Sequence, residues 1–348
     1  MNFGILGRVV ASLALALSFA ASAHAQSQVN LEAAFDRALG TEVRAPQDFS
    51  ARYDSQLARQ IAQIADGSQG RIGVAAIDLA TGEEVAVLGD QRFPMASTSK
   101  IAIAATFLEG VDQGRWSLSS EFPLMVPVPS KRFSSTVAPV RPGQYFPAAD
   151  LIEMMITRSN NQATDALLKA VGGPAAVNDW ARRAGLREFN LTRDIATLVR
   201  DDGEVDPAVA VDLRDSATPR EMVRLLQGIH QGQWLSASSR RVILGAMERC
   251  RTGTRRIPAM LPAGAIVAHK TGSLNNTSSD IGIISTPDGR TIAVAIYVTG
   301  QGTRLNREGR IANIARALYD GYGESAARQY ANARYGSAGS TGAGVAAN

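Results

Sequence analysis

A serine and a lysine three residues apart are candidates for a nucleophile and its base. The segment FPMASTSK places Ser97 at the start of an apolar stretch and Lys100 three positions later. In a helix, this spacing puts both side chains on one face. A serine hydroxyl becomes a good nucleophile only when a base takes its proton, which a desolvated lysine can do. Taken alone, the pattern is more typical of a helix cap followed by a surface lysine.

Two further short motifs carry polar side chains. SNN at 159–161 interrupts a helical stretch and is equally typical of a junction between helices. HKTG at 269–272 follows the apolar strand AIVA, where the alternative is a strand end with a turn glycine. There Lys270 would supply a fixed positive charge for an anionic substrate. The chain has only four lysines, of which Lys100 and Lys270 lie in these motifs, whereas arginine supplies its other basic charge. Lysine can lose its proton when buried, and arginine effectively cannot.

Composition excludes several classes of function. The 36 basic and 32 acidic residues leave a net charge of +4, too small to indicate a nucleic-acid partner. After removal of the N-terminal segment only His230 and His269 remain, which argues against a histidine-rich metal site. No metal or other cofactor is expected. Cys250 is the only cysteine, so an internal disulfide is excluded. Without a supporting histidine or asparagine near it in the sequence, a structural role is favoured for Cys250.

The N-terminus reads as a secretory signal. Arg8 precedes the apolar run VVASLALALSFAASA, and the small-residue pattern AHA ends at Ala25. An uncut anchor is the alternative, but the run is short for one. We expect cleavage near Ala25 and a periplasmic or secreted, soluble protein without a membrane anchor. Nothing in the sequence demands more than a monomer.

The element pattern predicts a mixed lobe built from both ends of the chain and a helical lobe inserted between them. Expected strands are a hairpin over 71–90 and the segments after 262, and the tail is rich in Gly, Ala and Ser. A long loop is expected at 187–217 and mainly loop at 115–145. We therefore expect an α/β (α+β) sandwich, an antiparallel sheet flanked by helices, with the site in the cleft. The expected parts are a signal peptide (1–25), an extension (26–50), a catalytic domain (51–323; mixed lobe 51–95 and 240–323, helical lobe 96–239) and a disordered tail (324–348).

Together, in this order and spacing, the three motifs resemble the S-x-x-K, S-x-N and K-T-G elements of the serine penicillin-recognising enzymes. LPAG before Lys270 and DLRDSATPREM at 212–222 narrow the resemblance to the class A serine β-lactamases, over about residues 50–322. The resemblance implies Ser97 as the acylated nucleophile, Lys100 as its proton partner and Ser159 as a proton relay to the leaving nitrogen. It further implies a substrate-binding set and an oxyanion hole made by the backbone N–H groups of Ser97 and Ser273. The substrate-binding residues would be Asn161, Lys270, Thr271, Gly272 and Ser273.

The sequence departs from the family pattern at two places that bear on the site. An arginine that many members carry before the aspartate matched by Asp280 is replaced by Ser278, and Arg256, fourteen residues before Lys270, is the candidate for that charge. Its alternative is an exposed surface arginine. Asn160 also replaces the usual aspartate of the middle motif.

The segment RDDGEVD, at 200–206, is a third departure from the family pattern. In the family this loop reads R-W-E-P-E-L-N, and its arginine pairs with an aspartate fifteen positions later. Arg200 and Asp215 have that separation. Alignment without a gap then puts Asp202 on the glutamate that activates the deacylating water. Glu204 is the rival base, and a loop without any base is the third option.

These observations predict a serine β-lactamase that hydrolyses the β-lactam amide of penicillins or cephalosporins through an acyl-enzyme on Ser97, with slow deacylation as one outcome. One alternative is a D-alanyl-D-alanine carboxypeptidase acting on peptidoglycan. Another is a penicillin-binding module that is acylated without turnover. The expected partner is a small β-lactam molecule.

Overall fold

The computed structural model of the chain describes residues 43–44, 53 and 55–338. The expected signal peptide lies outside the described residues, as do most of the expected extension and residues 339–348. The chain divides at Arg44 into two compact units. The described part of the first is a short strand, β1 (Val43–Arg44). The second unit contains all the motifs discussed above.

The centre of the second unit is a five-stranded antiparallel sheet with the order β10-β11-β12-β2-β3. Its strands come from both ends of the chain, as the sequence predicted. Their bounds are β2 (Ile72–Asp78), β3 (Glu84–Val87), β10 (Ile266–Leu274), β11 (Thr277–Ser285) and β12 (Thr291–Thr299). The register pairs Thr271 of β10 with Asp280 of β11. This pairing brings the HKTG motif beside the middle of β11.

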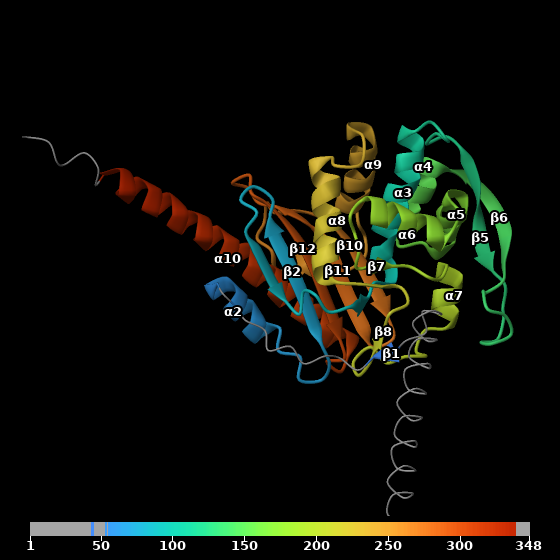
Figure 1. Cartoon of the computed structure of the whole chain (residues 1–348), viewed down its shortest axis with the longest axis horizontal. Helices are drawn as coiled ribbons and strands as arrows, with labels where there is room; N and C mark the ends of the chain where they lie inside the picture. Colours follow the sequence, from blue (N-terminus) through green and yellow to red (C-terminus); the bar gives the residue numbers. More distant parts are fainter. Residues whose placement is uncertain (1–42, 45–52, 54, 339–348) are drawn as a thin grey trace, which may run out of the picture. The chain divides into compact units, whose positions relative to one another are not determined.

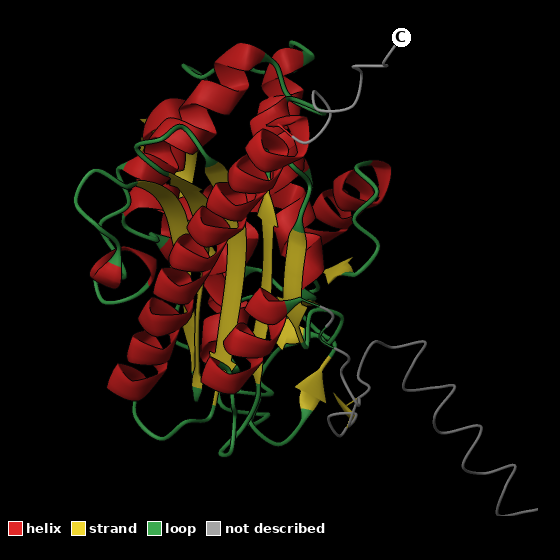
Figure 2. Cartoon of the chain, turned by 90° about the vertical axis from the view of Figure 1, so that its left-hand side faces the viewer, coloured by secondary structure: helices red, strands yellow, loops and turns green. Residues whose placement is uncertain are grey.

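Both faces of the sheet are covered, which explains why the strands are apolar almost throughout. Alternate residues of β2 enter two different cores: Ala75 packs toward the helical side, whereas Val74 and Ala76 pack on the opposite face. On that opposite face lie α2 (Gln56–Ile64) and the long helix α10 (Arg304–Ala338). Figures 1 and 2 show these two helices along one side of the sheet. The sheet is thus the middle layer of a sandwich.

The other face of the sheet carries the helical part. Helix α3 (Lys100–Asp112) is buried nearly all round, because ten of its residues are apolar or small and other helices surround it. Helices α8 and α9 pack against the sheet itself. The helices of this part are α3, α4 (Ala148–Thr157), α5 (Asn161–Val171), α6 (Pro174–Arg183), α7 (Ile195–Arg200), α8 (Pro219–Gln231) and α9 (Ala237–Glu248).

Three expectations about the elements were wrong. The segment 115–145 contains an antiparallel hairpin, β5 (Glu121–Pro127) with β6 (Val140–Pro147), although its prolines suggested loop. These strands are partly exposed, so the proline positions cost few ladder bonds. The loop at 187–217 contains helix α7, and α10 continues through Ala338 where disorder was expected.

Short strands and turns complete the second unit. A small sheet has the order β4-β9-β7, and β8 lies in the same loop region. The bounds are β4 (Phe93–Pro94), β7 (Phe189–Asn190), β8 (Val211–Asp212), β9 (Ser216–Ala217), and the 3₁₀ turns η1 (Ala96–Ser99) and η2 (Ile257–Met260). In the described part of the chain, no helix combines the length and apolar character needed to cross a membrane.

Candidate active site

Ser97 lies on the 3₁₀ turn η1, which leads directly into α3. The backbone N–H of Lys100 donates to the Ser97 carbonyl, and this hydrogen bond closes one 3₁₀ turn between the two residues. Ala96, just before the serine, has a φ of +49°. A non-glycine residue in this region is strained and is held only by its surroundings. Part of that support comes from Met95, whose N–H donates to the Asp215 carbonyl at 2.9 Å. The partly exposed Ser97 is therefore presented on a firmly held turn.

The Ser159 hydroxyl joins the two lysines of the motifs. Lys100 Nζ lies 3.2 Å from Ser159 Oγ, and Lys270 Nζ lies 3.0 Å from the same oxygen. Lys100 Nζ also donates to the Ser159 carbonyl and to Asn161 Oδ1, both at 2.8 Å. Ser159 sits at the break between α4 and α5 with a φ of +56°, which turns its side chain out of the helical path. The fold thus brings one or more residues of each of the three motifs into a single hydrogen-bonded group: Lys100, Ser159 with Asn161, and Lys270.

The two lysines differ in charge. Burial and then the nearby charge of Lys270 lower the pKa of Lys100 well below its usual value. Burial lowers the pKa of Lys270 to about 8, while the negative charges of Cys250 and Asp280 oppose that shift. The lowered pKa makes Lys100 a readier proton acceptor than an ordinary lysine, whereas Lys270, with a pKa of about 8, remains largely cationic near neutral pH.

Strand β10 lies directly against the serine turn. A Cβ atom at Gly272 would be 2.8 Å from the Met95 carbonyl oxygen and 2.4 Å from Ser279 Oγ, so any larger residue would push the strand away from η1. The neighbouring Thr271 Oγ1 is 2.6 Å from Thr252 Oγ1. The K-T-G motif and Ser97 are consequently adjacent, as the resemblance implied.

Arg256 lies behind the K-T-G strand and is only 1 % exposed, so its reading as a surface arginine was wrong. Its guanidinium donates to the carbonyls of Gly272 at 2.8 Å and Ser279 at 2.7 Å, and to Ser273 Oγ at 2.6 Å. Glu308 of α10 pairs with it at 3.1 Å. Arg256 therefore places positive charge beside Ser273 and fixes the backbone of β10.

Asp165 is a site residue that the sequence analysis missed. It follows Asn161 by one helical turn in α5 and is 5 % exposed. Its two carboxylate oxygens accept from the N–H groups of Ile195 at 2.7 Å and Ala196 at 2.9 Å. Burial raises its pKa to about 7, against the lowering effects of these amides and of Lys100. A cavity of about 300 Å³ borders Asp165 and Asn161. The signal available in the sequence was an aspartate four residues after Asn161, a spacing that puts both side chains on one face of a helix.

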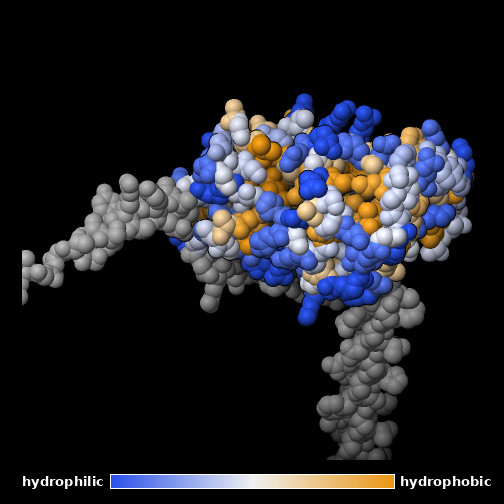
Figure 3. All heavy atoms as spheres, turned by 90° about the horizontal axis from the view of Figure 1, so that it is seen from above, coloured by the Kyte–Doolittle hydropathy of each residue, from blue (hydrophilic) through white to orange (hydrophobic). Residues whose placement is uncertain are grey.

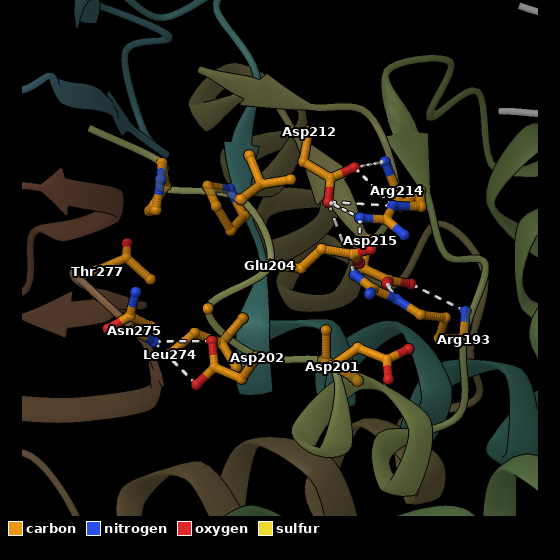
Figure 4. A pocket seen from close by; sticks show the side chains of 15 residues that line it. Arg193, Asp201, Asp202, Glu204, Asp212, Arg214, Asp215, Leu274, Asn275 and Thr277 are labelled. Atoms are coloured by element: carbon orange, nitrogen blue, oxygen red, sulfur yellow. Dashed lines mark hydrogen bonds and ion pairs between the residues drawn. The ribbon is translucent and has the colours of Figure 1, made fainter. Parts of the chain in front are cut away.

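The acids of RDDGEVD dock this segment onto other parts of the fold. Figure 4 shows the Asp202 carboxylate hydrogen-bonded to the backbone nitrogen of Asn275, at 2.9 Å from both oxygens. Glu204 pairs with Arg214 at 3.0 Å. The remaining two acids are also partnered: Asp201 by Arg200, and Asp206 by the side-chain amide of Asn276.

The expected pairing of Arg200 with Asp215 was wrong. Arg193 takes that place, with Nε 2.5 Å from Asp215 Oδ2, and Asp215 Oδ1 also accepts from the Thr192 and Arg193 N–H groups. Arg200 instead ends α7 and donates to the Ser135 carbonyl at 3.0 Å. Arg193 and Asp215 are 22 positions apart in the sequence, whereas Arg200 and Asp215 are fifteen apart. The ungapped alignment failed because α7 occupies the extra length.

The ungapped alignment was the argument for Asp202 as the deacylating base, and that argument no longer holds. It is exposed and lines a small polar pocket with Glu204, Arg214 and Asn275, and Ser97 is not among the residues lining that pocket (Figure 4). Glu204 is likewise exposed and engaged by Arg214. The catalytic role of Asp202 stays a prediction that this geometry does not support. Among the described residues, no cluster of three or more histidine, cysteine, aspartate or glutamate side chains is arranged to hold a metal ion.

The site and the fold agree with comparisons to known proteins. A model of the Beta-lactamase enzyme family matches residues 56–322. The chain is 30% identical over 276 residues to the extended-spectrum beta-lactamase PER-1 of Pseudomonas aeruginosa, an alignment that covers 76% of this chain and 86% of that protein. It is also 30% identical to beta-lactamase CTX-M-8 of Citrobacter amalonaticus, covering 76% and 88% of the two chains.

Comparison with solved structures also finds beta-lactamases. A beta-lactamase from Chitinophaga pinensis superposes with a TM-score of 0.67 and 27% identity, over 77% of this chain and 100% of the other. An ancestral class A beta-lactamase superposes with a TM-score of 0.65 and 34% identity, over 76% and 100%. Fold and site together define a serine enzyme of the penicillin-recognising type. The chain belongs to the beta-lactamase enzyme family, in class A.

Proposed function

We propose that this protein hydrolyses the β-lactam amide of penicillins and cephalosporins through an acyl-enzyme on Ser97. The observation that carries the proposal is the contact of Ser159 Oγ with a proton-accepting Lys100 on one side and a cationic Lys270 on the other. The relatives named above are beta-lactamases, which supports the same reaction class.

In acylation, Ser97 Oγ attacks the carbonyl carbon of the strained ring while Lys100 accepts its proton. The backbone N–H groups of Ser97 and Ser273 stabilise the oxyanion. Ser159 then delivers its proton to the ring nitrogen as the carbon–nitrogen bond breaks, and Lys100 passes the proton taken from Ser97 to the Ser159 oxygen. Because the Ser159 oxygen accepts from two amines, its own proton is free to point at that nitrogen.

Substrate binding is assigned to the residues around this centre. Lys270 and Thr271, with the next residue of β10, Gly272, would hold the carboxylate of the β-lactam. Arg256 adds positive charge to that end of the site through Ser273. Asn161 would bind the side-chain amide of the substrate. No step requires a metal or another cofactor.

For release of the acyl group we assign Asp165, rather than Asp202, as the carboxylate that acts on water. Its pKa of about 7 suits a general base at neutral pH. The cavity it shares with Asn161 is large enough for water molecules. Each oxygen already accepts one backbone N–H, so one lone pair on each remains for a water.

The activity is tested by mixing the purified protein with excess chromogenic cephalosporin and following product against protein concentration. We expect sustained turnover, and loss of both turnover and the initial burst in Ser97→Ala. One product per protein followed by a halt would identify a penicillin-binding module. Absence of any reaction, combined with release of D-alanine from D-alanyl-D-alanine peptides, would favour the carboxypeptidase.

We further propose that the protein acts as a monomer after export to the periplasm or beyond. The signal-like N-terminal pattern supports export.

A further inference from the structure

The fold brings a thiol, an imidazole and a carboxylate together outside the group that performs the reaction. Cys250 follows α9, His269 lies on β10 and Asp280 lies on β11. His269 Nδ1 is 2.9 Å and 3.0 Å from the two oxygens of Asp280. The side chains of His269 and Cys250 are hydrogen-bonded to each other. A structural role was favoured for Cys250 because no histidine lies near it in the sequence, whereas the fold places His269 beside it.

Charge and burial favour a thiolate in this arrangement. Burial by itself would raise the pKa of the Cys250 thiol, but the hydrogen bond and charge of His269 lower it below its usual value. Burial would lower the pKa of His269, but Asp280 raises it to about 10. Such a cationic neighbour is what makes a cysteine reactive. His269 and Asp280 are buried, whereas Cys250 is partly exposed.

The thiol is also connected to the residues assigned to the substrate carboxylate. Cys250 Sγ is 3.4 Å from Thr252 Oγ1, which in turn is 2.6 Å from Thr271 Oγ1. Negative charge on Cys250 raises the pKa of Lys270, against the larger lowering effect of burial. Removing that charge would therefore leave Lys270 less cationic.

We propose that Cys250, His269 and Asp280 form a reactive thiol site that exchanges with small disulfides, and that its occupation weakens binding at Lys270 and Thr271. In the exchange, the thiolate sulfur attacks one sulfur of the disulfide and a new S–S bond forms. The original S–S bond breaks, and the electron pair leaves on the second sulfur as a thiolate that takes a proton from solvent. His269 keeps its proton throughout. Only the effect on substrate binding rests on the proposed function.

The first test titrates the folded full chain with 5,5′-dithiobis(2-nitrobenzoate), with glutathione as the free-thiol reference. We expect release of one nitrothiobenzoate per chain, and none from Cys250→Ser. At pH 6 the rate should exceed that of glutathione by about threefold or more, because a larger thiolate fraction is only partly offset by weaker nucleophilicity. A thiol that reacts only after unfolding, or with the pH profile of glutathione, would overturn the proposal.

A variant separates activation from simple exposure. The charged groups that act on this site are His269, Lys270, Asp280 and Arg256. Asp280→Asn removes the charge that keeps His269 protonated, so the midpoint of the rate–pH profile should move upward toward that of glutathione. An unchanged midpoint in a folded Asp280→Asn protein would contradict the role of His269. If this variant does not fold, the profile of the unmutated chain still decides the question.

The second test measures cephalosporin hydrolysis before and after exchange. We expect a several-fold rise in KM that is reversed by dithiothreitol and absent in Cys250→Ser. Unchanged kinetics with full labelling would remove the link to binding and leave the thiol site standing. If no hydrolysis is found in the unmodified protein, the proposed function fails, while the labelling experiments still test the site.

Discussion

At the scale of single residues, the site depends on how its surroundings change ordinary side chains. Lys100 and Lys270 contact the same hydroxyl, and burial lowers the pKa of both. The charge of Lys270 lowers the pKa of Lys100 further, whereas Cys250 and Asp280 raise that of Lys270. Asp165 is shifted in the opposite direction, since burial penalises a carboxylate as it penalises an ammonium. These three shifts produce a lysine that accepts a proton readily, a lysine that is largely cationic and a carboxyl that titrates near neutrality.

Replacing Asp165 by asparagine should slow release of the acyl group. The amide cannot accept a proton, so we expect steady-state hydrolysis to fall by about 10²-fold or more, with acyl-enzyme accumulating on Ser97. Mass spectrometry of the protein quenched during turnover measures the acylated fraction. Asp202→Asn is the matched control and should leave turnover nearly unchanged. Equal turnover in the Asp165 variant and the unmutated protein would refute the assignment.

The pH dependence of deacylation follows from the same carboxyl. Since the pKa of Asp165 in the folded protein is about 7, its carboxylate form increases as pH rises through that value. The deacylation rate should therefore rise between pH 6 and pH 8, and single-turnover measurements in Asp165→Asn should lose this step. The folded pKa lies above the ordinary value of 3.8, so ionisation also costs folding free energy as pH rises from about 4 through 7. Asp165→Asn should thus lose less stability than the unmutated protein over that range.

At the scale of elements, the loop between α6 and α8 supports the serine turn. Asp215 accepts from the backbone at Thr192 and Arg193, and its own carbonyl accepts from Met95, two residues before Ser97. Asp215 itself has a φ of +49°. The pair with Arg193 therefore closes the loop and connects it to the nucleophile.

Removal of Arg193 should destabilise the protein. Asp215 is 3 % exposed, and Arg193→Ala would leave its carboxylate buried with two backbone N–H groups and the Thr192 hydroxyl, and without a positive charge. We expect a loss of about 3 kcal/mol in the free energy of unfolding, measured by urea denaturation. Arg200→Ala is the control and should cost much less, because its ion-pair partner Asp201 is only partly buried and keeps access to water. The reverse ranking would support the original pairing of Arg200 with Asp215.

At the scale of the whole molecule, one sheet separates two apolar cores. Strands from both ends of the chain form this sheet, and its two outer layers are α2 with α10 and the helical part. Viewed from above, Figure 3 shows hydrophobic residues reaching one face between hydrophilic ones, as is common on globular proteins. Arg256 and Glu308 couple the outer helix α10 to the strand that carries Lys270.

The export proposal makes a prediction for the whole chain. Expressed with its full sequence in a bacterium, the protein should begin at Gln26 after cleavage behind Ala25. N-terminal sequencing of the periplasmic fraction checks the position, and size-exclusion chromatography with light scattering checks the expected monomer. A full-length protein retained in membranes would show that the N-terminus is an uncut anchor.

Much of the fold and most of the site followed from the sequence, because their signals are local. The alternation of apolar runs and turns predicted β2, β3, β10, β11 and β12, and the order of three short motifs placed Ser97, Lys100, Ser159 and Lys270 in one family pattern. Rare lysines marked the positions where a titratable cation is needed. Such signals involve residues a few positions apart, and the chain fixes their relation directly.

Only the tertiary structure decided the relations between distant residues. Sequence spacing favoured Arg200 for Asp215, but the six residues of α7 separate Arg200 from the Arg193 region, and Arg193 reaches the carboxylate instead. Asp165 and Ile195 are thirty residues apart, and Cys250 meets His269 only because α9 packs on β10. Asp202 and Asp206 of RDDGEVD likewise have distant partners, Asn275 and Asn276, on the turn between β10 and β11. Hydrogen bonding and burial depend on distances in space, and these are set when the sheet and helices pack together.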